Sequence, residues 1–200
     1  MAAAVKVKRL PCSDDLAASL EHAWAVLERG AKDGKSRFHI GTLATVDERG
    51  WPAARSVVLR ECHRDERWLR FNTDNRSAKV EHCQRSPNAV MHFYSPEERI
   101  QLRARVRLEV LAGEALSRSW DRTAAMSRVC YQVTQAPGSP IEHPYAVETD
   151  SEATHEGEIN FASIRAHIDE LEWLYLNSSG HRRARFRFDG EGVHAEWLIP

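Results

Sequence analysis

The amino-acid sequence predicts a mainly β protein, an antiparallel barrel with a few flanking helices. Strand-like segments recur roughly every 8 to 12 residues between turn-forming residues, a spacing typical of closed or partly closed antiparallel barrels. Only two or three segments have helical periodicity. The clearest strand is residues 100–111, where apolar residues alternate strictly with polar ones. Such a period of two indicates a strand with one buried face.

Size and composition favour a single domain over residues 1–200. The chain is 42% apolar and 28% charged, which is ordinary for a globular protein. Its net charge of -1 excludes strong non-specific attraction to nucleic acid or to an anionic membrane, so we expect neither partner.

The four cysteines form no C-x-x-C pair and match no zinc-ligand spacing. They are therefore expected to be free thiols in a reducing compartment. The sequence begins without a signal-peptide core, and no run approaches the ~18 apolar residues of a membrane span. The cytoplasm is the expected location.

Helical periodicity is clearest near the start of the chain. Ser13, followed by two acids, is a candidate cap, and apolar residues recur at helical spacing from Leu16 to Leu27. Gly30 is the expected end of this helix. Residues 1–34 are thus predicted to form an N-terminal helical segment.

The remaining elements follow from turn signals and from changes in composition. Residues 135–158 contain three prolines and six acids without one Lys or Arg, which predicts a long, flexible acidic loop. Helices are expected over 77–84 and 115–131. The predicted strands are residues 37–47, 52–62, 67–73, 88–95, 100–111, 172–177, 182–188 and 193–200.

The stretch "FNTDNRSAKVEHCQ" (71–84) predicts a strand end, a turn and a short helix. Arg76 and Lys79 lie at the start of that helix, where the helix dipole disfavours a cation. A phosphate would explain them, because a helix N-terminus offers free N–H groups and the hydroxyls of Thr73 and Ser77 are close in sequence. The alternative is that both cations simply extend into water, since Ser-x-Lys stretches are common.

Arginine also stands at both ends of the apolar strand "RSVVLR" (55–60). A guanidinium can bind a phosphate with two hydrogen bonds. Arg55 and Arg60 have opposite parity and lie roughly 16 Å apart in a regular strand. One site uses both only if its ligand is long or a bulge intervenes, and otherwise they are ordinary surface arginines.

Two further basic stretches can be explained without a ligand. The arginines at 103, 105 and 107 are consistent with a solvated strand face, while "GHRRARF" (180–186) suits either a charged edge strand or a cation source for an anionic cofactor. The ten histidines show no metal-ligand spacing, so no metal site is predicted. No phosphate-binding P-loop, dinucleotide fingerprint or nucleophile-elbow motif occurs.

Taken in order, the motifs "RSVVLR", "FNTDNRSAK", "RIQLRARVRL" and "RRARFRFDGEGVHAEWLIP" resemble the pyridoxamine 5′-phosphate oxidase family of FMN-binding split barrels. The resemblance covers roughly residues 35–112 and 170–200. It implies a homodimer with FMN at the subunit interface. The implied cofactor-binding residues are Arg55, Ser56, Val57, Val58, Leu59, Arg60, Asn72, Thr73, Ser77, Lys79, Gln101, Tyr175 and Arg185.

The sequence departs from the family pattern mainly on the substrate side. Ala78 and Asn72 replace the family's Arg and Tyr in the flavin motif, and Arg60 replaces the lysine that holds the substrate phosphate. By an ungapped alignment, other residues also stand at the positions of the family's substrate-phosphate ligands, of its later Gln-Ser pair and of its R-x-H motif. The replacing residues are Trp120, Ala124, Arg128, Pro137, Gly138, His181, Arg182 and Arg183.

The resemblance therefore implies that the flavin pocket is largely kept and the pyridoxal-phosphate pocket largely lost. We expect an FMN-dependent oxidoreductase of undefined substrate, with Arg60, His181 and Arg183 as substrate-side candidates. One alternative is a genuine pyridoxamine-phosphate oxidase. The other is a non-enzymatic module, either a flavin carrier or a barrel that stacks single-stranded nucleic acid, which the near-zero net charge opposes.

Overall fold

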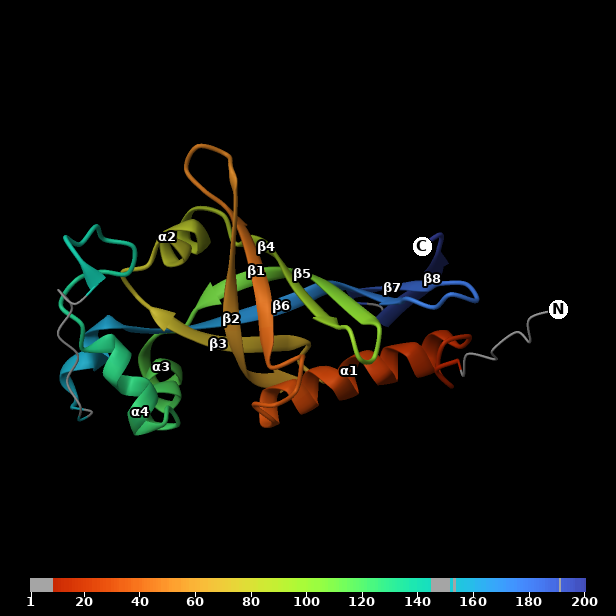
Figure 1. Cartoon of the computed structure of the whole chain (residues 1–200), viewed down its shortest axis with the longest axis horizontal. Helices are drawn as coiled ribbons and strands as arrows, with labels where there is room; N and C mark the ends of the chain where they lie inside the picture. Colours follow the sequence, from red (N-terminus) through yellow and green to blue (C-terminus); the bar gives the residue numbers. More distant parts are fainter. Residues whose placement is uncertain (1–8, 145–151, 153, 191) are drawn as a thin grey trace.

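The computed structural model describes residues 9–144, 152, 154–190 and 192–200. Eight strands of this described part form one antiparallel sheet in the order β3-β2-β1-β4-β5-β6-β7-β8. A further pairing of β3 with β6 closes six of them into a barrel, which confirms the predicted class (Figure 1). The strands are β1 (Ile40–Val46), β2 (Pro52–His63), β3 (Trp68–Asp74), β4 (Asn88–Ser95), β5 (Ile100–Val110), β6 (Phe161–Tyr175), β7 (Arg182–Asp189) and β8 (Gly192–Leu198).

Strand β6 pairs with three other strands, and it begins much earlier than the sequence predicted. It pairs with β5 along most of its length, with β3 through its first half and with β7 through its second half. Most of its residues are buried; buried and half-buried positions alternate from Ile164 to Asp169, where a shift in register with β5 interrupts the period of two. The expectation of a strand only from residue 172 was therefore wrong by eleven residues, because β6 begins at Phe161.

Helix α1 (Leu16–Lys32) packs against β2 and differs from prediction at both ends. Its N-cap is Asp15, whose carboxylate accepts a hydrogen bond from the Ala18 amide at 2.7 Å, so Ser13 is not the cap. The helix also runs past Gly30. That glycine is needed for close packing, since a Cβ there would lie 2.4 Å from the Phe38 carbonyl oxygen.

The single helix expected over residues 115–131 is broken. The structure has α3 (Gly113–Asp121), α4 (Ala125–Arg128) and a 3-10 turn, η1 (Val129–Tyr131). The Thr123 hydroxyl donates to the Ser119 carbonyl, and the Arg128 guanidinium donates to the carbonyls of Trp120, Asp121 and Thr123. These bonds end α3 by satisfying its last carbonyl groups.

The described part of the acidic loop is irregular up to residue 144, and a second 3-10 turn, η3 (Glu156–Asn160), leads into β6. Of the predicted flexible loop, residues 145–151 and 153 lie outside the described residues, and its flexibility stays a prediction.

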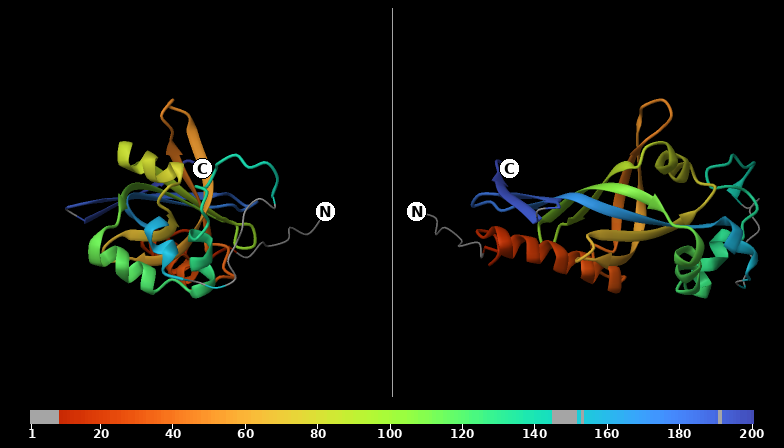
Figure 2. Two further views of the ribbon diagram at one scale, coloured as in Figure 1. Left: turned by 90° about the vertical axis from the view of Figure 1, so that its left-hand side faces the viewer. Right: turned by 180° about the vertical axis from the view of Figure 1, so that it is seen from behind.

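The molecule is elongated, with the short helix α2 (Ala78–Arg85) near one end and the β7–β8 hairpin at the other (Figure 1). Helices α3 and α4 lie near the α2 end, while α1 runs along one side toward the hairpin, as the two further views also show (Figure 2). Among the described residues, no helix combines the length and the apolar character that crossing a membrane requires.

Candidate functional site

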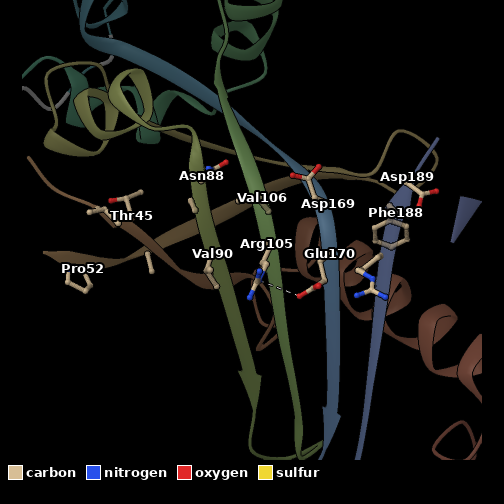
Figure 3. Close-up of a pocket in the computed structure, with 14 residues that line it drawn as sticks. Thr45, Pro52, Asn88, Val90, Arg105, Val106, Asp169, Glu170, Phe188 and Asp189 are labelled. Carbon is tan, nitrogen blue, oxygen red and sulfur yellow. Dashed lines mark ion pairs between the residues drawn. The ribbon is translucent and has the colours of Figure 1, made fainter. Parts of the chain in front are cut away.

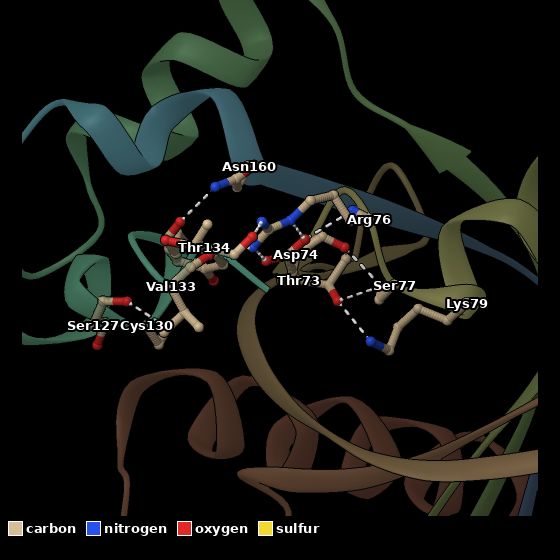
Figure 4. A network of polar contacts seen from close by, with 11 residues as sticks. Thr73, Asp74, Arg76, Ser77, Lys79, Ser127, Cys130, Val133, Thr134 and Asn160 are labelled. Atoms are coloured by element: carbon tan, nitrogen blue, oxygen red, sulfur yellow. Dashed lines mark hydrogen bonds and ion pairs between the residues drawn. The ribbon is translucent and has the colours of Figure 1, made fainter. Parts of the chain in front are cut away.

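A polar cluster forms where β3 ends and α2 begins (Figure 4). Lys79 Nζ donates to Thr73 Oγ1 at 2.8 Å, and that oxygen lies 3.2 Å from Ser77 Oγ. Ser77 is the N-cap residue of α2, but its hydroxyl donates to the Asp74 carbonyl at 2.6 Å and does not cap the helix. The first-turn N–H groups of α2 are thus left without a side-chain acceptor, which favours an anion at this end.

Strand β2 adds a second cation to the cluster. Arg55 Nη1 donates to Thr45 Oγ1 at 2.7 Å and to the Leu43 carbonyl at 3.3 Å. Thr45 Oγ1 also lies 2.8 Å from His82 Nδ1, one turn after Lys79 on α2. Through Thr45, hydrogen bonds therefore join strands β1 and β2 to helix α2.

Within the described part of the chain, neither Arg55 nor Lys79 has a carboxylate at ion-pair distance. Burial, and next the nearby Arg55, lower the pKa of Lys79 below its ordinary value. Burial likewise lowers the pKa of Arg55. Two half-buried cations, two hydroxyls and a helix N-terminus are the donor set that a phosphate monoester requires. The residues present therefore fit the phosphate group of FMN.

Arg76, the other cation expected to face a phosphate, turns away from the cluster. Its guanidinium contacts both carboxylate oxygens of Asp74 and donates to the carbonyls of Val133 and Thr134. Of the two cations at the start of α2, only Lys79 faces the cluster.

The side chains of the strand 55–60 alternate between two faces. The side chains of Val57 and Leu59 are buried in the barrel core. These two residues can therefore contact a ligand only through their backbone groups. Ser56, Val58 and Arg60 face outward. The strand is irregular between Leu59 and Glu61, where its register with β3 shifts.

Asn72 lies on the opposite face of β3 from Thr73. Its amide donates to Thr123 Oγ1 at 3.1 Å, and its oxygen accepts from Arg70 Nη1 at 2.6 Å. Arg70 is only 5% exposed and also binds Glu61. Asn72 thus belongs to a structural network and not to the cationic cluster. A cavity of about 240 Å³ beside it is also lined by Arg60 and Arg122.

The other predicted residues gather on the outer face of β5, β6 and β7. Gln101 pairs with Leu174 of β6, which in turn pairs with Arg183 of β7. Arg183 Nη2 lies 2.6 Å from Glu172, and Arg185 Nη2 lies 2.9 Å from Glu196.

Tyr175 and His181 are already engaged in contacts at the end of β6. Tyr175 is 3% exposed, and its hydroxyl accepts from Asn177 Nδ2 at 2.8 Å. His181 Nδ1 accepts from the Asn177 amide at 3.0 Å. In this chain Tyr175 packs in the core, so its ring is not presented to the cationic cluster.

The predicted site residues therefore form two groups. One group lies at the start of α2, and the other lies along β5–β7 toward the opposite end of the molecule (Figure 1). A single copy of the chain does not bring Lys79 and Arg183 to one small ligand.

A groove of about 780 Å³ crosses the sheet between these groups (Figure 3). It begins at Thr45, the residue that accepts from Arg55, and reaches Glu170, which pairs with Arg105 and lies 4.0 Å from Arg185. Its floor is mostly apolar and its rim carries both signs of charge. The floor includes Ala44, Val46, Pro52, Ala89 and Val90, and the rim Arg105, Asp169, Glu170 and Arg187.

Sequence reasoning missed Thr45, His82 and Cys83 as neighbours of the cluster. Lys79, His82 and Cys83 share one helical face at i, i+3 and i+4, so the helix residues were detectable from spacing. Thr45 had no such signal, because its place depends on barrel closure. Burial raises the pKa of Cys83 to about 11 although Arg55 and Lys79 act in the opposite direction, so its thiol stays protonated near neutral pH.

Comparisons with known proteins show which sequences and folds this chain is similar to. Residues 21–112 match the sequence model of the pyridoxamine 5′-phosphate oxidase FMN-binding domain. A pyridoxine/pyridoxamine 5′-phosphate oxidase of Deinococcus deserti is 26% identical over 187 residues, covering 87% of this chain and 85% of the relative. Oxidase 2 of Arabidopsis thaliana is 30% identical over 128 residues, covering 58% of this chain and 64% of the relative.

The fold has a solved counterpart. A pyridoxamine 5′-phosphate oxidase-related, FMN-binding protein of Nostoc punctiforme has a TM-score of 0.73 and 25% identity, covering 97% of this chain and 100% of that one. The matched segment, the relatives and the shared split barrel agree with one another: in sequence and in fold this chain is similar to pyridoxamine 5′-phosphate oxidase-like, FMN-binding proteins.

Proposed function

We propose that the protein is an FMN-dependent oxidoreductase whose cofactor phosphate is held at the start of α2. The observation that carries this proposal is the pair of partly buried cations, Arg55 and Lys79, with no carboxylate partner among the described residues. Thr73 and Ser77 supply hydroxyls beside them. FMN supplies the redox chemistry when bound, and the chain binds, orients and electrostatically tunes it.

The outward-facing residues Ser56, Val58 and Arg60 are the proposed contacts to the rest of the flavin. Gln101, Arg185 and the substrate-side candidates His181 and Arg183 lie in the second group, and we assign them to the flavin of a partner copy. This assignment follows from the separation of the two groups in one chain.

A homodimer with FMN at the subunit interface is therefore part of the proposal. The groove has an apolar floor and a rim with both Arg105 and Glu170, so the same surface of a second copy can complement it. Sedimentation equilibrium should give the mass of two chains. Val90→Glu, which places a charge on the half-buried floor, should give one chain; a monomeric wild type would contradict the dimer.

Absorption and titration test the flavin proposal directly. Purified protein should carry a flavin spectrum, or added FMN should show a bound-state shift near micromolar concentration. A screen of reductants, NADPH among them, should then bleach the bound flavin. A protein that binds FMN but is bleached by none of them would be a flavin-binding module and not an oxidoreductase.

A genuine pyridoxamine-phosphate oxidase is the second candidate, because the curated relatives carry that activity in their names. The structure weakens it at the positions aligned with the substrate-phosphate ligands. Trp120 is buried and Arg128 is occupied with the carbonyls at the end of α3. Peroxide release with pyridoxamine phosphate, abolished by Arg60→Ala, would establish this activity.

For the compartment we propose the cytoplasm, because Cys12, Cys62, Cys83 and Cys130 are all free thiols.

A further inference from the structure

Asp74 places a buried carboxylate directly beside the proposed phosphate subsite. It follows Thr73 at the end of β3, and its side chain is 8% exposed. Its charge acts on Lys79, since it is one of the groups that raise the pKa of that lysine against the lowering effects of burial and Arg55. An anion at this position repels a phosphate bound by the same lysine.

Arg76 is held tightly on this carboxylate (Figure 4). Its Nε lies 3.0 Å from Oδ1 and its Nη2 lies 2.8 Å from Oδ2, while its backbone amide donates to Oδ1 at 2.8 Å. Two-point contact of this kind is the strongest geometry available to an arginine–carboxylate pair.

The guanidinium is fixed from its other side by the segment that follows η1. Nη1 donates to the Thr134 carbonyl and Nη2 to the Val133 carbonyl, both at 2.9 Å. The preceding turn η1 is itself tied to η3, directly before β6, because Asn160 Nδ2 donates to the Tyr131 carbonyl at 2.8 Å. The hydrogen bonds of the Arg76 guanidinium thus point toward Asp74 and these carbonyls, and away from Lys79.

We propose that Arg76 is a positioning residue for the phosphate subsite. It neutralises Asp74 and holds the turn from Asp74 to Ser77, so that Ser77 and Lys79 face the phosphate. The inference rests on the proposed function, since it concerns the same subsite. It also explains a cation at the start of α2, a place that the helix dipole disfavours.

Charge compensation makes a prediction that simple loss of structure does not. Arg76→Ala leaves the Asp74 charge uncompensated beside the phosphate, so FMN binding should weaken by about tenfold. Riboflavin has the same ring but no phosphate, and its affinity should change by less than about twofold. Adding Asp74→Asn to Arg76→Ala removes the repulsion and should restore FMN affinity to within about threefold of wild type.

The experiment is a fluorescence titration of the wild type and the variants with FMN and with riboflavin, alongside thermal unfolding of each protein. Arg76→Lys keeps the charge and should retain most of the preference for FMN, which gives a second variant if Arg76→Ala folds poorly. Arg37→Ala, which breaks an exposed pair with Glu97, is the matched control and should leave both affinities unchanged.

The outcomes separate the two levels of the proposal. A wild type that prefers FMN to riboflavin, with an Arg76→Ala variant that keeps the full preference, overturns the role of Arg76 alone. A double variant as weak toward FMN as Arg76→Ala also overturns charge compensation. A wild type with no preference for FMN overturns the phosphate subsite itself, and the role of Arg76 with it.

Discussion

Two regions of the molecule use cationic side chains in opposite ways. On the outer face of β5–β7, arginines stand over buried carboxylates: Glu172 contacts both Arg103 and Arg183, and its side chain is 7% exposed. Near the start of α2, and among the described residues, the hydrogen bonds of Arg55 and Lys79 go to two hydroxyls and one carbonyl.

The pKa directions show the same contrast. Burial acts to raise the pKa of Glu172, but its hydrogen bonds from Arg183 and Arg103 outweigh it and lower that pKa. Burial lowers the pKa of Lys79, and Arg55 lowers it further. The charge of a paired arginine is balanced within the chain, whereas a partly desolvated cation with no carboxylate partner among the described residues indicates an anionic ligand.

The largest expected effect comes from removing the unpaired lysine. Lys79→Ala should weaken FMN binding by about 1.5 to 3 kcal/mol, the loss of a charge-assisted hydrogen bond to the phosphate. Equilibrium titration with FMN measures it, and Lys35→Ala, at an exposed lysine, should bind like the wild type. An unchanged dissociation constant would remove Lys79 from the site.

The paired region should respond in stability and not in phosphate recognition. Glu172→Gln weakens two charged contacts in a buried place and should lower the free energy of unfolding by about 1 to 2 kcal/mol. Chemical denaturation measures this change. The ratio of FMN to riboflavin affinity should stay at the wild-type value, and a fall in that ratio would show that the contacts of Glu172 with Arg103 and Arg183 also serve phosphate binding.

A smaller effect is expected from the hydroxyl that positions Lys79. Thr73→Val keeps the shape of the side chain but removes the acceptor at 2.8 Å from Lys79 Nζ. FMN affinity should fall by about 0.5 to 1.5 kcal/mol, the net value of one hydrogen bond. Wild-type affinity in this variant would mean that Lys79 does not depend on Thr73 for its position.

The mildest test is the pH dependence of binding. Burial and Arg55 bring the pKa of Lys79 below its ordinary 10.5 in the free protein, and a bound phosphate favours the charged lysine and raises that pKa again. FMN affinity should therefore be constant below the free-protein pKa and fall as the pH rises through it. Dividing the wild-type affinity by that of Lys79→Met removes the titration of FMN itself; a ratio that stays constant up to pH 10.5 would contradict the effect.

Local patterns predicted part of the fold well. The alternation from Ile100 to Val110 gave β5 to within one residue, because this strand has one core face and one polar face. Most of strand β6 was missed, because its alternation is confined to Ile164–Asp169 and a shift in register with β5 interrupts it there. The break at Thr123 was missed because side-chain bonds to carbonyls, and not a glycine or proline, end α3.

The site was predictable where it lies within one continuous stretch. Thr73, Ser77 and Lys79 are neighbours in sequence and come together at one turn. Arg76 was placed wrongly because its partners, Val133 and Thr134, lie far along the chain. The separation of Arg185 from this cluster likewise depends on barrel closure, which periodicity does not report.

The most direct test is a titration of the wild-type protein with FMN and with riboflavin, followed by flavin fluorescence. If Arg55, Lys79 and the start of α2 hold the phosphate, one FMN should bind per chain near or below micromolar concentration, and riboflavin should bind at least about tenfold more weakly. No binding of FMN in that range, or riboflavin binding as tight as FMN, would contradict the phosphate subsite.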